Sequence, residues 1–214
     1  MKNISSENFI VIPDVRDLDL EQTLDCGQSF RWEKQNDGSF SGVAFGKYVN
    51  ISLDGTDMII KNAAPDDEKI WREYFDLELD YGKIRGDISK LHPVLEEAAR
   101  YAPGIRILRQ EPWEALCSFI ISQNNNIPRI KGIIERLCDE FGNGEKGKKS
   151  FPSAETLSKL TVEDLAPLRA GFRAKYIIDA AQKVANGEID FKKIEESPIE
   201  FGRDELQKIK GVGA

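Results

Sequence analysis

A change in residue periodicity along the chain is the feature that most restricts its fold. Through the first sixty residues, short runs rich in β-branched and aromatic side chains alternate with turn-forming sequences. The predicted strands are residues 9–12, 29–32, 40–45, 48–53 and 58–60. Turn signals such as Asn36-Asp37-Gly38 and Asp54-Gly55 lie between them at hairpin spacing. We therefore predict an antiparallel meander.

Helical spacing replaces the strand pattern after residue 65. Ile70, Tyr74 and Leu77 recur at helical intervals, and His92 followed by Pro93 is typical of a helix start, with His92 as a capping residue. From about residue 101 the pattern is helical throughout. The first predicted helix there begins at Pro112, and the next one ends near Gly142. Further helices are predicted at residues 153–160, 161–169, 173–186 and 198–209. We expect an α+β fold, with an N-terminal α+β domain at 1–100 and an all-α domain at 101–214.

Composition is that of a soluble globular protein and excludes several classes. The 214 residues contain no apolar run of membrane-spanning length and no N-terminal apolar segment typical of a secretory signal. Cys26, Cys117 and Cys138 are too widely spaced for a zinc site or a disulfide framework, which favours a reducing cytoplasm. No metal or organic cofactor is predicted.

The net charge of −7 is unevenly distributed along the chain. Residues 1–100 hold 12 lysines and arginines against 20 aspartates and glutamates, whereas residues 101–214 hold 18 against 17. The acidic total weakens the case for a nucleic-acid partner, but the second half remains free to approach phosphates locally.

Residues 118–129 carry the most unusual local sequence, Ser-Phe-Ile-Ile-Ser-Gln-Asn-Asn-Asn-Ile-Pro-Arg. Three consecutive asparagines continue an apolar helix poorly because their amides compete for backbone hydrogen bonds. Their paired donors and acceptors beside the Arg129 cation suit recognition of a base or a disrupted base pair. A helix-ending cap is the alternative role for residues 124–126, and a solvated helix position is the alternative for Arg129.

The final residues, 206–214, follow the pattern Leu-x-x-Ile-x-Gly-Val-Gly. Glycine permits positive φ and lets backbone N–H groups come close to a phosphate. The pattern indicates a helix-hairpin-helix element that binds the DNA backbone through Gly211, Val212 and Gly213 without reading sequence. A plain Gly-x-Gly helix cap is the alternative.

Five segments carry a family resemblance, in chain order. They are Gly-Gln-Ser-Phe-Arg-Trp at 27–32, Ile-Leu-Arg-Gln at 107–110, the asparagine segment at 118–129, Gly-Phe-Arg-Ala-Lys-Tyr at 171–176, and the hairpin. Together they resemble the 8-oxoguanine DNA glycosylases of the helix-hairpin-helix superfamily, from about residue 8 to the end. The resemblance implies a TATA-binding-protein-like sheet domain followed by a helical glycosylase domain that is incomplete at its C-terminus. It also implies base-excision repair of 8-oxoguanine opposite cytosine in double-stranded DNA, by a cytoplasmic or nucleoid-associated monomer without a membrane partner.

The resemblance further implies roles for individual residues. Gly27 would offer its carbonyl to the N7–H of 8-oxoguanine, which guanine lacks, and a mismatched buried group there costs roughly 1–3 kcal/mol. Asn124 would fill the space of the flipped base, while Arg129 and Arg173 would hold the opposite cytosine. Phe172 would wedge into the base stack. The other implied substrate-binding residues are Gln28 and Phe119.

Each of these residues also has an ordinary structural alternative. Gly27 could be a turn glycine, Arg173 a solvated helix residue and Phe172 a core residue. Their joint occurrence in family order favours the functional interpretation.

No catalytic residue is assigned within the chain. In the family, the lysine that attacks the sugar follows Gly-Val-Gly-x directly, which corresponds to position 215, and a catalytic aspartate lies further on. An amine nucleophile displaces the base and forms a Schiff base that permits strand cleavage. We expect these 214 residues alone to be inactive, and a full-length member to be a glycosylase and AP lyase. The alternatives are a glycosylase for alkylated purines, a non-enzymatic DNA-binding module and a helical scaffold, and the residue at 215 discriminates enzyme from binding module.

Overall fold

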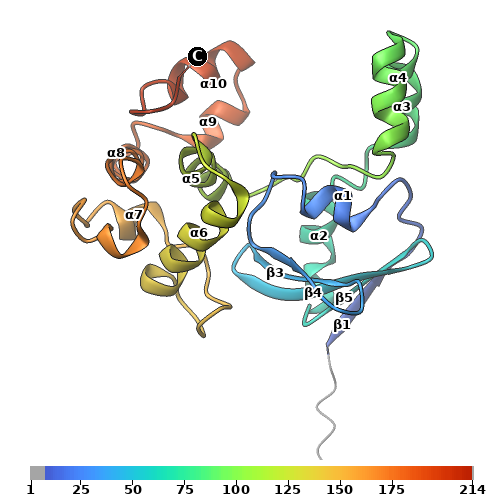
Figure 1. Ribbon diagram of the computed structural model, residues 1–214, viewed down its shortest axis with the longest axis horizontal. Helices are drawn as coiled ribbons and strands as arrows, with labels where there is room; N and C mark the ends of the chain where they lie inside the picture. The colour runs from blue at the N-terminus through green and yellow to red at the C-terminus, as the bar shows by residue number, and fades with distance from the viewer. Residues whose placement is uncertain (1–7, 214) are drawn as a thin grey trace, which may run out of the picture. The chain divides into compact units, whose positions relative to one another are not determined.

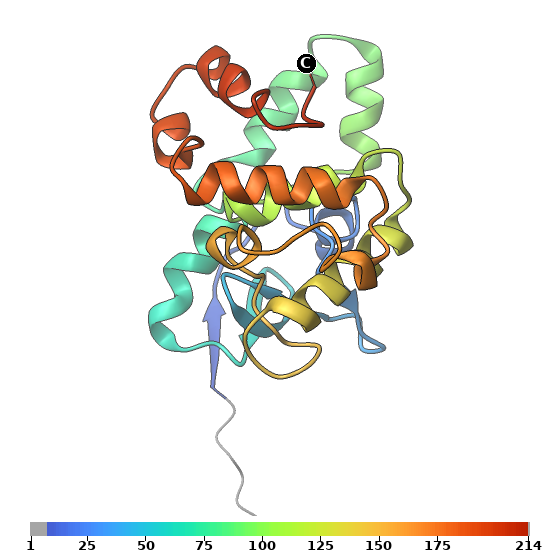
Figure 2. The same cartoon turned by 90° about the vertical axis from the view of Figure 1, so that its left-hand side faces the viewer.

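The computed structural model describes residues 8–213 (Figures 1 and 2). Contacts along the chain divide it into two compact units, Met1–Gln110 and Glu111–Ala214. No helix among the described residues is long and apolar enough to cross a membrane.

The boundary between the units lies after Gln110 rather than after residue 100, where the sequence pattern placed it. Residues 104–110 belong to the first unit because long-range hydrogen bonds hold them there. The backbone N–H of Arg109 donates to the carbonyl of Tyr74 over 2.9 Å. Such bonds join positions far apart in the sequence, so local periodicity does not reveal them.

The first unit contains a five-stranded antiparallel sheet with strand order β1-β5-β4-β3-β2. The strands are β1 (Phe9–Ile12), β2 (Trp32–Lys34), β3 (Phe40–Ala44), β4 (Lys47–Asp54) and β5 (Asp57–Lys61). Strands β2 to β5 pair with their sequence neighbours, which confirms the predicted meander, and β1 pairs with β5 at the opposite edge.

Helices α1 (Leu20–Leu24) and α2 (Glu68–Tyr74) cover one face of the sheet (Figure 1). Alternating residues point to that face, so Ile51 and Ile60 are fully buried in adjacent strands while Phe9 is exposed. Burial of each such side chain contributes about 1.5–3 kcal/mol. The aromatic part of this core is Trp32, Phe40, Trp71, Tyr74 and Phe75.

Strand β2 begins at Trp32, so the prediction of a strand at residues 29–32 was wrong. Trp32 pairs with Gly42 in β3, and a Cβ on Gly42 would lie 2.5 Å from the indole ring. Gln28, four residues before Trp32, bonds to the segment 106–110, as described below.

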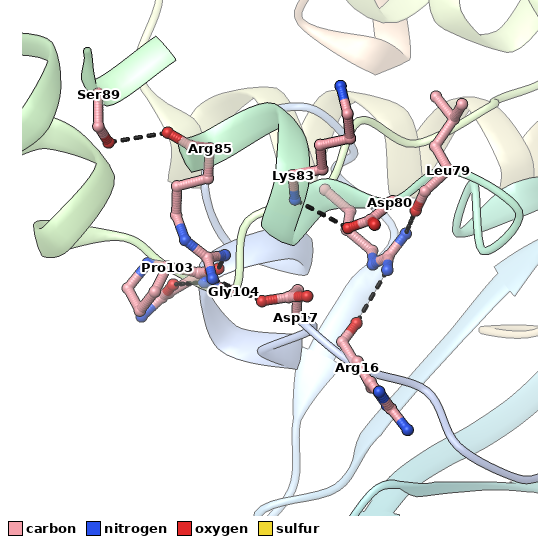
Figure 3. Close-up of polar contacts among 11 residues, drawn as sticks. Arg16, Asp17, Leu79, Asp80, Lys83, Arg85, Ser89, Pro103 and Gly104 are labelled. Atoms are coloured by element: carbon pink, nitrogen blue, oxygen red, sulfur yellow. Dashed lines mark hydrogen bonds and ion pairs between the residues drawn. The ribbon is translucent and has the colours of Figure 1, made fainter. Parts of the chain in front are cut away.

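Two further helices, α3 (Tyr81–Ser89) and α4 (Pro93–Tyr101), pack against each other and extend away from the sheet (Figure 1). His92 caps α4 by accepting a hydrogen bond from the N–H of Val94, which confirms its predicted role. Figure 3 shows how α3 is attached: Arg85 bonds to the carboxylate of Asp17 over 2.6 Å and to the carbonyl of Pro103. A single 3₁₀ turn, η1 (Pro65–Asp67), precedes α2.

Every element of the second unit within the described residues is helical. The elements are α5 (Pro112–Ser122), α6 (Ile127–Phe141), α7 (Ala154–Leu157), η2 (Ala166–Leu168), α8 (Arg173–Ala185), α9 (Phe191–Glu195) and α10 (Ile199–Leu206). Pro112 occupies the first turn of α5 and Gly142 ends α6, as predicted. The helix expected at 161–169 is only the 3₁₀ turn η2, and α1, α3 and α9 were not predicted.

The core of the second unit lies between α5, α6 and α8, which pack together in both views (Figures 1 and 2). Apolar residues at helical spacing form it because each helix presents one buried stripe. Its fully buried members include Ile120, Ile121, Ile133, Leu137 and Ile177.

Candidate functional site

The turn between α5 and α6 gives its three asparagines different roles. The side-chain amide of Asn125 donates to the carbonyl of Ile121 and so closes the end of α5. Asn126 caps α6 by accepting the N–H of Arg129 over 3.0 Å. Asn124 is exposed, adopts a φ of 46°, and its side-chain amide has no hydrogen-bond partner between residues 8 and 213. The helix-ending alternative therefore holds for Asn125, whereas Asn126 begins the next helix and Asn124 is free for a ligand.

Arg173 holds this turn from α8. Its side chain is buried, and its guanidinium donates to the carbonyls of Gln123 and Asn124, the latter over 2.8 Å. It also donates to the carbonyl of Ala170 over 3.3 Å. Burial lowers the pKa of Arg173, and the charge of Arg129 lowers it further. In this geometry Arg173 supports the Asn124 turn, and its predicted contact with cytosine stays a prediction.

Arg129, in contrast, is exposed. Within residues 8–213 its guanidinium makes one hydrogen bond, a 3.5 Å contact with the carbonyl of Arg169. Of the two arginines predicted to hold a base, only Arg129 therefore presents its donors to solvent.

Phe172 and Phe119 are also exposed, at 49% and 52% of their surface. The Phe172 ring contacts the Tyr176 ring edge-on at 5.8 Å, and the guanidinium carbon of Arg173 lies 4.5 Å from its centroid. Phe172 is thus a supported surface ring and not the core residue of the alternative interpretation. Phe119 lines an open apolar groove of about 750 Å³, together with Ile199 and Val212.

The hairpin after α10 is anchored on α8. Gly211 has a φ of 87°, and a Cβ there would lie 2.5 Å from the Tyr176 ring, so the turn requires glycine. The N–H groups of Gly211 and Gly213 donate to no acceptor in the described part of the chain. The N–H of Val212 is already bonded to Ile209, so only the two glycines present free donors in this structure.

Two polar side chains that the motifs did not identify join these segments. Gln123 donates from its amide to the carbonyl of Gly211, which ties the asparagine turn to the hairpin. Asp179 accepts the backbone N–H of Lys210 and the ammonium of Lys183, each over 2.9 Å. Burial alone would raise the pKa of Asp179, but these hydrogen bonds outweigh it and the pKa is lowered. In the sequence, the four-residue spacing of Asp179 and Lys183 on one helix face was the signal that could have identified this ion pair.

In the first unit, Gly27 occupies an exposed loop with a φ of 89°. Its carbonyl accepts no hydrogen bond from any residue that the structure describes. Gln28 is half-buried. Its side-chain amide donates to the carbonyl of Arg106 and accepts the N–H of Leu108, so both ends of the amide already have backbone partners. Its predicted contact with substrate stays a prediction. Among residues 8–213 no group of three or more His, Cys, Asp or Glu side chains lies together where it could hold a metal ion.

Comparison with known proteins identifies the family. Residues 10–116 match the 8-oxoguanine DNA glycosylase N-terminal domain, and residues 117–211 match the HhH-GPD superfamily of base-excision DNA repair proteins. The chain belongs to the 8-oxoguanine DNA glycosylase family.

Individual relatives agree with this membership. The chain is 36% identical over 192 residues to the N-glycosylase/DNA lyase of Saccharomyces cerevisiae, covering 79% of this chain and 50% of the relative. It thus spans about half the length of the curated relatives it matches.

Two solved structures of the family share the fold. One is the Clostridium acetobutylicum 8-oxoguanine glycosylase/lyase with double-stranded DNA containing cytosine opposite 8-oxoguanine (TM-score 0.91, 39% identity, 96% of this chain and 72% of that one). The other is MBOgg1 with a low-affinity DNA ligand (TM-score 0.91, 48% identity, the same coverages of 96% and 72%). These likenesses confirm the predicted α+β fold of an 8-oxoguanine glycosylase.

Proposed function

We propose that the protein containing this chain removes 8-oxoguanine opposite cytosine from double-stranded DNA by base flipping, and that it also cleaves the resulting abasic site. The observation that carries the proposal is the exposed, unpaired amide of Asn124, presented on a turn that hydrogen bonds tie to the hairpin. A group that reads a base and a group that grips the backbone are thereby held in one unit.

The conformation of Asn124 supports its role as the residue that fills the gap left by the flipped base. Asparagine adopts the left-handed backbone more readily than most non-glycine residues, so modest support from its surroundings suffices to hold it there. Arg173 supplies that support by donating to the carbonyls of Gln123 and Asn124, which belong to the two peptide units on either side of the Asn124 Cα. The amide is thus pre-organised before DNA arrives, with two donors and one acceptor for a widowed base.

The neighbouring exposed groups suit the remaining tasks. Arg129 carries free donors for the ring acceptors of the opposite cytosine, and the Phe172 ring is an apolar wedge of the kind that unstacks a base step. The free N–H groups of Gly211 and Gly213 suit a phosphate of the backbone. Extrusion of a base costs a few kcal/mol, which these contacts together would offset.

Lesion recognition is assigned to Gly27. Its unpaired carbonyl is an acceptor, which suits the N7–H of 8-oxoguanine and opposes the N7 lone pair of guanine. An unsatisfied buried group costs about 1–3 kcal/mol, so this single contact would discriminate by roughly ten-fold or more.

No lysine of the chain takes the nucleophile's role by motif. Lys210 lies before the turn, and its ammonium is 3.4 Å from the carboxylate of Asp179. We therefore expect a polypeptide of residues 1–214 alone to release no base. The protein would act as a monomer in the cytoplasm or at a nucleoid, with no metal or organic cofactor.

Borohydride trapping on an 8-oxoguanine:cytosine duplex, with the full-length gene product, tests the proposal. The expected result is a covalent protein–DNA adduct, none with a guanine:cytosine duplex, and a strong loss of adduct in Asn124→Ala. The matched control is Asn143→Ala, which changes an exposed asparagine in the loop after α6. Base release without an adduct would remove the lyase part of the proposal. The absence of both base release and adduct would contradict the whole proposal and favour a binding module.

A further inference from the structure

The loop that carries Gly27 is clamped by two glutamines. The amide nitrogen of Gln28 donates to the carbonyl of Arg106 over 2.8 Å, and its amide oxygen accepts the N–H of Leu108 over 3.1 Å. The carbonyl of Gln28 accepts a hydrogen bond from the side chain of Gln110 over 2.8 Å. Three bonds therefore connect this one residue to the segment 106–110.

The side-chain amide of Gln28 has only one orientation that satisfies both partners. A backbone carbonyl needs a donor and a backbone N–H needs an acceptor, so exchanging the amide oxygen and nitrogen would break both bonds. The side chain pairs with the extended segment as another strand would, and it is half-buried, which partly shields these bonds from water.

The segment that receives the clamp is itself held firmly. Arg106 is 3% exposed, and its guanidinium donates to the carbonyls of Asp76 and Arg16 over 2.7 and 2.8 Å. Figure 3 shows the carbonyl of Arg16 at the end of one of these bonds. The guanidinium carbon also lies 4.4 Å from the centroid of the Tyr81 ring. The clamp therefore joins the loop to a buried part of the first unit.

This anchoring matters because glycine cannot fix its own carbonyl. Gly27 has no side chain to restrict its backbone, and no atom lies within 4 Å of where a Cβ would be. The carbonyl of Gly27 and the N–H of Gln28 belong to one planar peptide unit, so fixing the Gln28 backbone limits the direction of that carbonyl.

We propose that Gln28 and Gln110 are positioning residues that aim the Gly27 carbonyl at the N7–H of 8-oxoguanine. The inference rests on the proposed function. It replaces the expectation that Gln28 itself binds the substrate, because both ends of its amide are bonded to the backbone.

The test uses Gln28→Met and Gln110→Met in the full-length gene product, which remove the hydrogen bonds and keep side-chain length. Gln35→Met is the matched control, since Gln35 is also half-buried and donates to a backbone carbonyl, that of Glu33. Two quantities are measured: the single-turnover rate of base release from an 8-oxoguanine:cytosine duplex, and the Kd for a duplex with a tetrahydrofuran abasic analogue opposite cytosine. The analogue has no base, so its Kd reports DNA grip without lesion recognition.

We expect Gln28→Met to lower the release rate by about ten-fold or more, because two bonds to the segment 106–110 are lost together with longer contacts to Thr23 and Cys26. Gln110→Met, which loses one bond to Gln28, should lower it by roughly three-fold to ten-fold. The Kd for the analogue duplex should stay within about two-fold, as for any interaction made only with the base. An unchanged release rate in both variants overturns the inference, as does a parallel loss of release and of analogue binding, which a purely structural role would cause. Failure of the wild-type protein to release 8-oxoguanine would instead remove the proposed function.

Discussion

Replacing Arg173 with methionine separates support of the asparagine turn from direct contact with a base. The side chain of methionine fills similar space but donates no hydrogen bonds, so the carbonyls of Gln123, Asn124 and Ala170 lose their partner. Hydrogen bonds from a charged donor are worth about 1.5–3 kcal/mol each, but they are not additive and two of these carbonyls are within reach of water. We expect a net destabilisation of about 2–4 kcal/mol, which lowers the unfolding midpoint of a domain of this size by about 10 °C or more.

Arg129→Met is the matched control in the same unit. Arg129 is exposed and makes one hydrogen bond of 3.5 Å, so its loss should change stability by less than about 0.5 kcal/mol. Thermal unfolding followed by circular dichroism measures both variants, and Kd values for 8-oxoguanine:cytosine and 8-oxoguanine:adenine duplexes measure opposite-base preference. Arg129→Met should reduce the preference for cytosine at normal stability, and Arg173→Met should weaken binding to both duplexes.

The reasoning would be refuted by either of two results. If Arg173→Met unfolds at the wild-type temperature, the hydrogen bonds of Arg173 to the carbonyls of Gln123 and Asn124 do not hold the turn. If the two variants lose cytosine preference equally and neither loses stability, both arginines act by direct contact and the structural role assigned to Arg173 is wrong.

Two further predictions concern the hairpin. Gly211→Ala should weaken binding to an abasic-analogue duplex by at least about ten-fold, because the new Cβ would lie 2.5 Å from the Tyr176 ring and alanine is also disfavoured at positive φ. Gly187→Ala is the control: Gly187 also has a positive φ, of 79°, but its Cβ would meet no neighbouring atom, so binding should be unchanged. Because the pKa of Asp179 is lower in the folded protein, the unfolded chain binds a proton at this carboxylate more readily than the folded chain does. The contribution of Asp179 to the free energy of unfolding is therefore complete above the ordinary aspartate pKa of about 4, and it is lost as the pH falls through the lower pKa of the folded state. Asp179→Asn should therefore lower stability at pH 7 and remove this part of the loss of stability as the pH falls below the ordinary aspartate range. Urea unfolding with the same pH dependence as the wild type would contradict the assignment.

Sequence patterns predicted the helix starts well because capping is local. Pro112 and His92 lie within the first turn or cap of helices that begin where expected, and each acts on residues no more than four positions away. The hairpins of the sheet were equally accessible, since turn residues and alternating side chains lie next to the strands that they connect. Short elements were missed, such as the five-residue helix α1, because so few residues show no clear period.

Motifs selected the candidate residues of the second unit, and their role in binding stays a prediction. Asn124, Arg129 and Phe172 are exposed in the second unit, on a surface that hydrogen bonds connect to the hairpin. The hydrogen-bond partners of Arg173 and Gln28 were not predictable, because a motif identifies a residue without showing which backbone groups its side chain will contact. Arg173 bonds to carbonyls about fifty positions away, and Gln28 to a segment about eighty positions away.

The sequence by itself therefore determined the α+β class, most helix starts, the meander and the family, because each follows from local propensity or from short motifs in order. Only the tertiary structure decided that β1 joins the sheet beside β5, that Arg173 is buried beneath the Asn124 turn, and that Asp179 anchors the hairpin. Each of these features depends on hydrogen bonds to backbone groups that are distant in sequence. Every non-proline residue offers the same donor and acceptor, so the partner is chosen by packing and not by residue type.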